Sequence, residues 1–265
     1  MTELSALRAA SLFDLTGEVA LVTGASSGLG RRFARVLAAN GAKVALVARR
    51  KDRLEALAAE LKSAGCAAIA LEADVIDPAA MQRAFDGAEQ ALGAVTICVN
   101  NAGISRPSRL VDHDRQGWRE TMEVNLDAVW DIGVMAAQRM SAAGRKGAIV
   151  NLASILSFGT GRSNGAYAVA KAGVMQLTKV MGFEFARLGV RANAIAPGYF
   201  STEINADYLA GAGSEMTKHI PMRRFGNEGE LDGALLLLAS PKAGAYITGA
   251  TYVVDGGHTL QIAGV

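Results

Sequence analysis

The chain has 265 residues, of which 51% are hydrophobic and 20% charged, and its formal net charge at pH 7 is only +2. This composition is ample for a buried core and excludes an intrinsically disordered chain, and the small charge argues against nucleic acid or an anionic membrane as the main partner. Two cysteines, Cys66 and Cys98, are too few for a disulfide framework. The N-terminal segment is not typical of a secretory signal, and the apolar runs are shorter than a membrane span. We therefore expect a soluble, cytoplasmic protein.

Short β-branched runs alternate with longer helical patterns along most of the chain. The runs that predict strands are residues 19–24, 43–48, 67–75, 95–100, 147–154, 190–196 and 250–256. Between them, apolar residues at spacings of three and four predict helices, two of them long, at about 112–142 and 167–188. Asp77 and Pro78 are typical of an N-cap and the first position of a helix, which we expect to run to Gly93.

The expected strands are almost uniformly apolar, as in a parallel sheet that helices cover on both faces. The pattern predicts one α/β domain over residues 1–265, a doubly wound, Rossmann-type fold with a parallel sheet of about seven strands. Residues 199–226 interrupt the alternation and are rich in small, polar and aromatic residues. Long insertions of this kind are often substrate lids, and a packed surface excursion is the alternative.

The segment TGASSGLG, residues 23–30, lies where the first strand passes into the first helix. Its glycines allow a sharp turn and a close approach to a pyrophosphate, which the helix N-terminus would stabilise. A tight turn for packing is the alternative, but the strand before and the helix after favour dinucleotide binding. The residues predicted to bind are Gly24, Ser26, Ser27, Gly28, Leu29 and Gly30.

The end of the second strand indicates which dinucleotide to expect. NAD-binding folds place an acidic residue there for the ribose 2′-hydroxyl, whereas this chain has Arg49, Arg50 and Lys51. Arg49 can accept a 2′-phosphate through a charge-assisted hydrogen bond, with Arg50 beside it, and a solvated basic loop is the alternative. We therefore predict NADP(H) as the cofactor in preference to NAD(H).

Two further segments end strands, at the edge where open α/β sheets bind ligands. Asp74 and Val75 end the third strand, and Asp74 could bond the adenine amino group. Asn101, Ala102 and Gly103 follow the fourth strand, where their small side chains leave room for a ribose. A turn that binds no ligand is the alternative for this asparagine–glycine segment.

Six segments together resemble the short-chain dehydrogenase/reductase family, in its short, single-domain branch. They are TGASSGLG, NNAG at residues 100–103, Asn125 in MEVNL, Ser154, YAVAK at residues 167–171, and Pro197–Gly198. They occur in the order typical of the family, and the resemblance extends from about Phe13 to Gly257.

The resemblance implies a catalytic set of Asn125, Ser154, Tyr167 and Lys171. Tyr167 would be the general acid in ketone reduction and the base in alcohol oxidation. A free tyrosine has a pKa of about 10, so Lys171, one helical turn along, would favour the phenolate and also bond the nicotinamide ribose. Ser154, thirteen residues before Tyr167, would hold the substrate oxygen, and Asn125 would position a water that relays protons to Lys171. Pro197, Gly198 and Thr202 would line the nicotinamide side, with Thr202 bonding the carboxamide. The alternatives are a turn residue at the end of a strand for Ser154, a residue that caps or bends a helix for Asn125, and a cap for Thr202.

The sequence says less about the substrate. Apolar residues around these motifs suggest a small ketone or secondary alcohol with an apolar part, although several of them could simply pack the lid. With Ser154, the pocket candidates are Ile155, Leu156, Phe158, Tyr199, Phe200, Ile204, Tyr208, Leu209 and Met216. We expect a carbonyl reductase with a small-molecule substrate, and an epimerase or dehydratase on the same scaffold is a further option. His113, His219 and His258 have no metal-ligand spacing, so we expect no metal.

Two alternative functions stay open. The 3-oxoacyl-(acyl-carrier-protein) reductases of the family dock their acidic carrier through basic residues on the two long helices. The corresponding positions here hold Asp131 and Phe183, although Arg139 and Arg162 are available elsewhere. The other alternative is a non-catalytic NADP(H)-binding sensor, which would be expected to have lost part of the catalytic set, and the set is intact.

The two long helices carry more large apolar side chains than one core face needs. These side chains are Trp130, Met135, Met181, Phe183 and Phe185. The resemblance implies a homotetramer or homodimer that is built on these helices.

Overall fold

The computed structural model describes residues 8–200, 213 and 215–260. Its centre is a seven-stranded parallel sheet with the order β3-β2-β1-β4-β5-β6-β7. The strands are β1 (Val19–Thr23), β2 (Lys43–Ala48), β3 (Ala68–Glu72), β4 (Ile97–Asn100), β5 (Gly147–Leu152), β6 (Val190–Pro197) and β7 (Thr251–Val254). All seven predicted strands are confirmed, and several are shorter at their ends. The strand order reverses between β1 and β4, which is where doubly wound folds bind dinucleotides.

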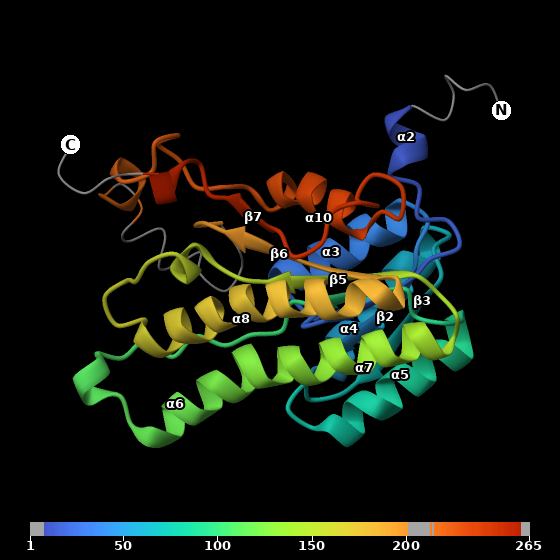
Figure 1. Ribbon diagram of the computed structural model, residues 1–265, viewed down its shortest axis with the longest axis horizontal. Helices are drawn as coiled ribbons and strands as arrows, with labels where there is room; N and C mark the ends of the chain where they lie inside the picture. Colours follow the sequence, from blue (N-terminus) through green and yellow to red (C-terminus); the bar gives the residue numbers. More distant parts are fainter. Residues whose placement is uncertain (1–7, 201–212, 214, 261–265) are drawn as a thin grey trace.

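Helices cover both faces of the sheet (Figure 1). The described helices are α2 (Ala9–Leu12), which lies off the sheet, α3 (Gly28–Ala39), α4 (Lys51–Ser63), α5 (Pro78–Leu92), α6 (Arg115–Met122), α7 (Ala128–Ala142), α8 (Gly165–Glu184) and α10 (Asp232–Ala239). One hydrophobic core joins the sheet to α3, α4 and α10, and a second joins the opposite face to α5, α7 and part of α8. The predicted single, doubly wound α/β domain is therefore confirmed.

Strand β1 shows why its sequence is apolar throughout. Ala20 and Val22 belong to the core under α3 and α10, whereas Val19 and Leu21 belong to the core under α5 and α7. Successive side chains of a strand point to opposite faces, so a sheet that is covered on both faces needs apolar residues at every position. The register that results places the carboxyl ends of β1, β4 and β5 at one edge of the sheet.

The predicted start of α5 is confirmed in detail. The Asp77 carboxylate accepts hydrogen bonds from the N–H groups of Ala79 and Ala80, at 2.9 and 3.0 Å, and Pro78 is the first helical residue. Gly93 follows the helix with a φ of +102°, a conformation that residues other than glycine rarely adopt.

The helical region that was predicted at about 112–142 contains one irregular turn. A short 3-10 turn, η1 (Leu110–Asp112), precedes α6, and a π-helical turn, η2 (Glu123–Asp127), separates α6 from α7. Within it, the Asn125 side chain donates a 3.0 Å hydrogen bond to the Thr121 carbonyl oxygen. Side chains that bond a carbonyl of the preceding turn compete with the regular helix ladder, which accounts for the wider turn at this residue.

The predicted lid at 199–226 lies partly outside the described residues. Its two described ends meet, because the Gly226 N–H donates to the Tyr199 carbonyl oxygen at 2.9 Å and Phe200 pairs with Gly226. The lid hypothesis stays a prediction. In the described part of the chain, no helix has the length and apolar character that a membrane span requires.

Candidate active site

The glycine-rich turn between β1 and α3 combines close packing with open space. Gly24 and Gly28 have φ values of +67° and +50°. A Cβ atom added to Gly24 would lie 2.7 Å from the Asn101 side-chain nitrogen, and one on Gly30 would collide with the Gly24 carbonyl oxygen. A Cβ atom on Gly28 would meet no described protein atom within 4 Å. Gly28 is itself buried, but the position where its Cβ atom would stand is free of described protein atoms, as the close approach of a pyrophosphate requires, while Leu29 packs against the core.

Arg50 is the basic group that contacts this turn. Its guanidinium donates to the Ser26 hydroxyl at 2.8 and 3.1 Å and to the Ser27 hydroxyl at 2.7 Å. Ser27 is the N-cap residue of α3, but its hydroxyl is engaged by Arg50. The first backbone N–H groups of α3 are thus available to an anion.

Arg49 lies beside Arg50 at the end of β2, and its side chain is exposed. Its guanidinium is 3.6 Å from the Asp74 carboxylate, which follows β3 at the same edge of the sheet, and Val75 is buried in the core. Two guanidinium groups therefore lie near the end of the glycine turn. This charge fits a dinucleotide that carries a 2′-phosphate.

Thr23 fastens the segment after β4 to the end of β1. Its hydroxyl oxygen accepts hydrogen bonds from the N–H groups of Asn101 and Ala102, at 3.0 and 3.1 Å. The Asn101 side chain returns a 3.0 Å bond to the Thr23 carbonyl oxygen. The two predicted cofactor segments are thus held together, and Thr23 is a functional candidate that sequence reasoning missed, although it begins the glycine motif.

Asn125 holds the backbone that follows this segment, at a place that Lys171 Nζ also approaches. Its side chain exchanges two hydrogen bonds with the backbone of Ile104, accepting from the N–H at 3.1 Å and donating to the carbonyl at 2.9 Å. A Cβ atom on Gly103 would lie 2.7 Å from the Asn125 side-chain oxygen and 3.8 Å from Lys171 Nζ. The Asn125 side chain therefore holds the Gly103–Ile104 backbone directly, and the water relay stays a prediction.

Tyr167 and Lys171 lie in the first two turns of α8. Lys171 is 3% exposed, its ammonium donates to the Leu152 carbonyl oxygen at 2.6 Å, and no described carboxylate forms an ion pair with it. Burial lowers the pKa of Lys171 to about 8. Lys171 Nζ is 5.7 Å from the centroid of the Tyr167 ring. Burial raises the pKa of Tyr167, and a hydrogen bond with Ser154 opposes this shift.

Ser154 lies two residues after β5 and is the N-cap of a 3-10 turn, η3 (Ile155–Ser157). Its hydroxyl oxygen accepts a hydrogen bond from the Leu156 N–H at 3.2 Å, and the same hydroxyl is near enough to the Tyr167 phenol to oppose the rise of its pKa. The structure thus brings together Ser154, Tyr167 and Lys171, as the sequence predicted. Ser157, whose hydroxyl bonds the Lys171 carbonyl oxygen at 2.8 Å, was missed.

Pro197 and Gly198 lie at the end of β6, against the end of β7. The Gly198 N–H donates to the Val254 carbonyl oxygen at 2.9 Å, and a Cβ atom on Gly198 would lie 2.8 Å from the Asp255 Cα. Only a residue without a side chain fits this approach. Thr202, Ile204, Tyr208 and Leu209 lie outside the described residues.

The described substrate-side candidates have different surroundings. Leu156 is half-buried and Phe158 is exposed, whereas Phe200 is 5% exposed and belongs to the core that contains α10. The Tyr199 ring makes edge contacts with Phe225 and His258, at centroid distances of 6.3 and 5.5 Å. Leu156, Phe158 and Tyr199 remain candidates for the pocket wall, and the role of Phe200 in it stays a prediction.

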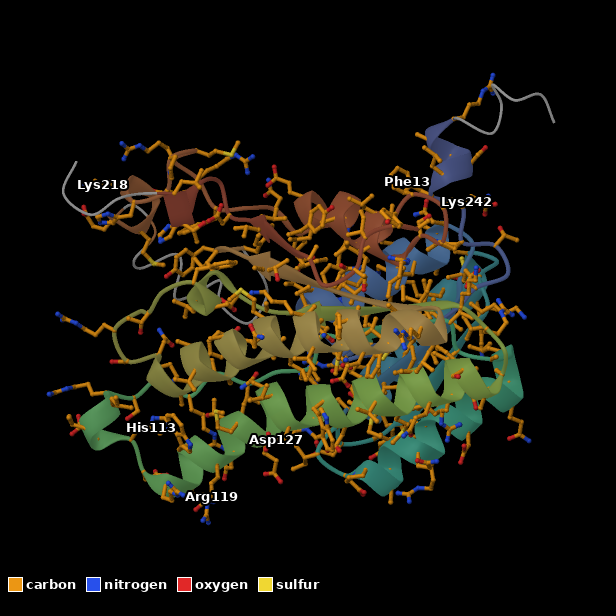
Figure 2. The ribbon with its side chains drawn as sticks, viewed as in Figure 1. Phe13, His113, Arg119, Asp127, Lys218 and Lys242 are labelled. Atoms are coloured by element: carbon orange, nitrogen blue, oxygen red, sulfur yellow. The ribbon has the colours of Figure 1, made fainter. Side chains whose placement is uncertain are left out.

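The histidines are scattered. His113 lies before α6, far from Lys218, the neighbour of His219 (Figure 2). Within residues 8–200, 213 and 215–260, no three His, Cys, Asp or Glu side chains form a group that could hold a metal ion.

Comparisons with known proteins agree with this arrangement. Residues 24–259 match the family described as Enoyl-(Acyl carrier protein) reductase. The chain is 41% identical over 257 residues to galactitol 2-dehydrogenase (L-tagatose-forming) from Cereibacter sphaeroides, covering 94% of this chain and 98% of that protein. It is 34% identical over 247 residues to 3-oxoacyl-[acyl-carrier-protein] reductase from Synechocystis sp., covering 93% and 98%. A solved gluconate 5-dehydrogenase from Burkholderia cenocepacia J2315, in complex with NADP and tartrate, has a TM-score of 0.91 and 37% identity, covering 96% of this chain and all of that one.

Proposed function

Because the chain belongs to the short-chain dehydrogenase/reductase family of oxidoreductases, we propose that it interconverts a ketone and a secondary alcohol with NADP(H). The observation that carries this proposal is the convergence of Ser154, Tyr167 and Lys171 at the edge of the sheet that holds the glycine turn. A hydroxyl, a phenol and a buried ammonium form a proton-transfer group there.

Each of these side chains has one role in the proposal. Ser154 holds the substrate oxygen by a hydrogen bond, and Tyr167 gives that oxygen a proton in reduction or takes it in oxidation. An ordinary phenol is already protonated at neutral pH and burial raises the pKa of Tyr167 further, so Tyr167 carries the proton that a general acid must give. Lys171 stabilises the phenolate that forms when the proton leaves. When bound, NADP(H) supplies or accepts the hydride.

The cofactor preference is proposed from the basic residues at the glycine turn. Arg50 bonds Ser26 and Ser27, and Arg49 lies exposed beside it, so both can reach a phosphate at this edge. An acidic residue for a free 2′-hydroxyl is missing from the end of β2. The bound NADP of the similar gluconate 5-dehydrogenase supports this proposal.

For the substrate we propose a small hydroxylated ketone or the matching secondary alcohol. The names of two similar proteins specify galactitol and gluconate as substrates. Phe200 packs in the core, whereas Phe158 is exposed and remains a candidate for the pocket wall, so an apolar part of the substrate stays compatible with the described residues. The substrate panel therefore needs ketoses and keto acids as well as apolar ketones.

A second candidate, 3-oxoacyl-(acyl-carrier-protein) reductase, is favoured by the similar Synechocystis protein. The two long helices argue against carrier docking. Arg139 is 16% exposed in its side chain, and its guanidinium forms ion pairs with Asp86 and Glu89 at 2.6 Å each. Phe183 is 84% exposed where a basic residue was expected. We expect no binding of an acyl carrier protein at micromolar concentration, and such binding would favour the second candidate.

The test is oxidation of NADPH and NADH with a panel of ketones, comparing the parent with Tyr167→Phe. We expect at least about a 100-fold loss of kcat in Tyr167→Phe, because the phenol proton is removed, with NADPH binding retained. Tyr246→Phe is the matched control, since Tyr246 is exposed on the surface. Tight NADPH binding by the parent without turnover of any substrate would favour a sensor and contradict the proposed activity.

A further inference from the structure

The hydroxyl of Ser157 joins two segments that carry proposed catalytic residues. Ser157 is the last residue of η3 and is buried. Its oxygen accepts a 3.3 Å hydrogen bond from the Ser154 N–H and donates a 2.8 Å bond to the Lys171 carbonyl oxygen in α8. A single hydroxyl therefore links the backbone of the residue that would hold the substrate to the backbone of the residue that would activate Tyr167.

A second bond completes a ring between the same two segments. Lys171 Nζ donates to the carbonyl oxygen of Leu152, the last residue of β5 and two residues before Ser154. Lys171 is thus tied to the end of β5 at its backbone through Ser157 and at its ammonium through Leu152. Two attachment points on one residue restrict both the position and the rotation of α8 at this turn.

Ser157 also serves η3 itself, because its bond with the Ser154 N–H forms half of a capping box. A cap of this kind would need no partner on another element. The bond to Lys171 crosses to α8, fourteen residues along the chain. A purely local role of Ser157 as a cap does not explain this bond from its hydroxyl to the Lys171 carbonyl oxygen.

We propose that Ser157 is a positioning residue, which sets the placement of Lys171 and Tyr167 on α8 relative to Ser154. This inference rests on the proposed function for its kinetic consequence. Small displacements of reacting groups lower rates strongly, so a buried hydroxyl that fixes their relative positions affects turnover without touching the substrate. Without the hydroxyl, the Ser154 N–H loses its buried partner, and Lys171 loses one of its two hydrogen bonds to the segment that includes the end of β5 and η3.

The test compares Ser157→Ala and Ser157→Thr with the parent. We expect Ser157→Ala to lower kcat about tenfold with little change in NADPH affinity, the size that loss of one hydrogen bond supports. Ser157→Thr keeps the hydroxyl and should restore most of kcat. The matched control is Thr96→Val, since the buried Thr96 hydroxyl accepts from the Val19 N–H at 3.1 Å, before the start of β4.

A second readout does not depend on turnover. In protein labelled with ¹³C-lysine, the Lys171 resonance is identified by its loss in Lys171→Met and followed against pH without cofactor. The pKa of Lys171, about 8 in the parent, should move up toward the ordinary value of 10.5 in Ser157→Ala, because a less constrained ammonium is better solvated. Thr96→Val should leave it unchanged.

The outcomes separate the inference from the proposed function. Unchanged kcat and an unchanged Lys171 titration in folded Ser157→Ala would overturn the positioning role. If Ser157→Ala does not fold, Ser157→Cys, which nearly keeps the volume, provides the same comparison. If the parent turns over no substrate, the proposed activity fails, and the Lys171 titration still decides whether Ser157 positions this residue.

Discussion

Lys171 carries the least favourable charge of the proposed site. Its ammonium is buried, is bonded to one carbonyl oxygen and has no carboxylate partner among the described residues. Burying an unpaired charge destabilises the folded state, and such a charge is typical of functional sites. The free energy of unfolding should therefore depend on whether Lys171 is charged.

We predict that Lys171→Met changes how stability depends on pH. The pKa of Lys171 is about 8 in the folded protein, against 10.5 for an ordinary lysine, so between these values the unfolded state binds more protons. The free energy of unfolding of the parent should therefore rise with pH across this window, by about 3 kcal/mol relative to Lys171→Met. Below about pH 8 the full cost of the buried charge is present. Urea unfolding at several pH values without cofactor measures the difference.

Lys43→Met is the control for this measurement. Lys43 also donates to a backbone carbonyl, that of Leu92 at 3.0 Å, but from an exposed residue. Lys43→Met therefore removes a lysine and its hydrogen bond without removing a buried charge. Parallel curves for the parent and Lys171→Met would show that Lys171 is not a buried ammonium.

Arg49 offers a test of cofactor preference, because its side chain is exposed and makes one long ion pair with Asp74. Arg49→Asp removes a charge that attracts a 2′-phosphate and adds a carboxylate that can accept from a 2′-hydroxyl. We predict that kcat/KM for NADPH falls at least about tenfold while that for NADH is kept or raised. Arg53→Asp, on the exposed surface of α4, is the control. An unchanged ratio of the two cofactors would contradict the assignment of Arg49.

At the scale of elements, different glycines of the turn from β1 into α3 are required for packing and for ligand binding. Gly24 and Gly30 are required by packing, because a side chain at either would meet protein atoms. Gly28 has open space beside it and a φ of +50°. The missing side chain of Gly28 therefore allows the positive φ and the approach of a ligand, and it is not needed to avoid a packed neighbour.

We predict that Gly28→Ala and Gly65→Ala lose similar stability and differ in cofactor binding. Both glycines have positive φ, +50° and +82°, and no described atom within 4 Å of an added Cβ. The conformational cost should be about 1–2 kcal/mol in each. Gly65 follows α4, away from the glycine turn, so only Gly28→Ala should weaken NADPH binding, about tenfold or more. Fluorescence titration with NADPH and urea unfolding give the two quantities. Equal NADPH affinities would mean that the pyrophosphate does not approach Gly28.

The site elements were predictable to different degrees. The Ser154–Tyr167 pairing was accessible because both residues belong to recognisable motifs at a fixed spacing. The bond from Asn101 to Thr23, 78 residues away, and that from Ser157 to Lys171 join segments whose contact depends on the fold. Residues with small polar side chains give no pattern for such contacts, so sequence reasoning left out Thr23 and Ser157. The irregular turn at Asn125 agrees with the alternative that this residue bends a helix, although the helical periodicity that continues on both sides of it does not predict a π-helical turn.

For the whole molecule, the fold was readable because its signal is local and repeated. Seven apolar runs, each followed by a helical pattern or a turn, require only the rule that a parallel sheet is covered on both faces. The strand ends were less accurate, because Ala73 to Val75 and Ala153 to Ser154 continue the apolar or small-residue pattern beyond the sheet. The partners of the domain depend on which side chains lie together on its surface, and the sequence alone does not show how those side chains are arranged.

The surface of α7 and α8 leads to the last prediction, that the protein is a homodimer or homotetramer built on these helices. They lie side by side on one face of the molecule (Figure 1), and Trp130, Val180 and Phe183 are exposed on them. Of the other side chains that were expected at this surface, Met181 is buried in the core, and Met135 and Phe185 pack against it. Apolar residues gathered on helices in this way are typical of interfaces. Phe183→Asp removes such contact without disturbing the core, since Phe183 is exposed, and should yield a smaller species in sedimentation velocity. Ile76→Asp, at an exposed apolar residue off these helices, should not. A monomeric parent at micromolar concentration would contradict this assembly.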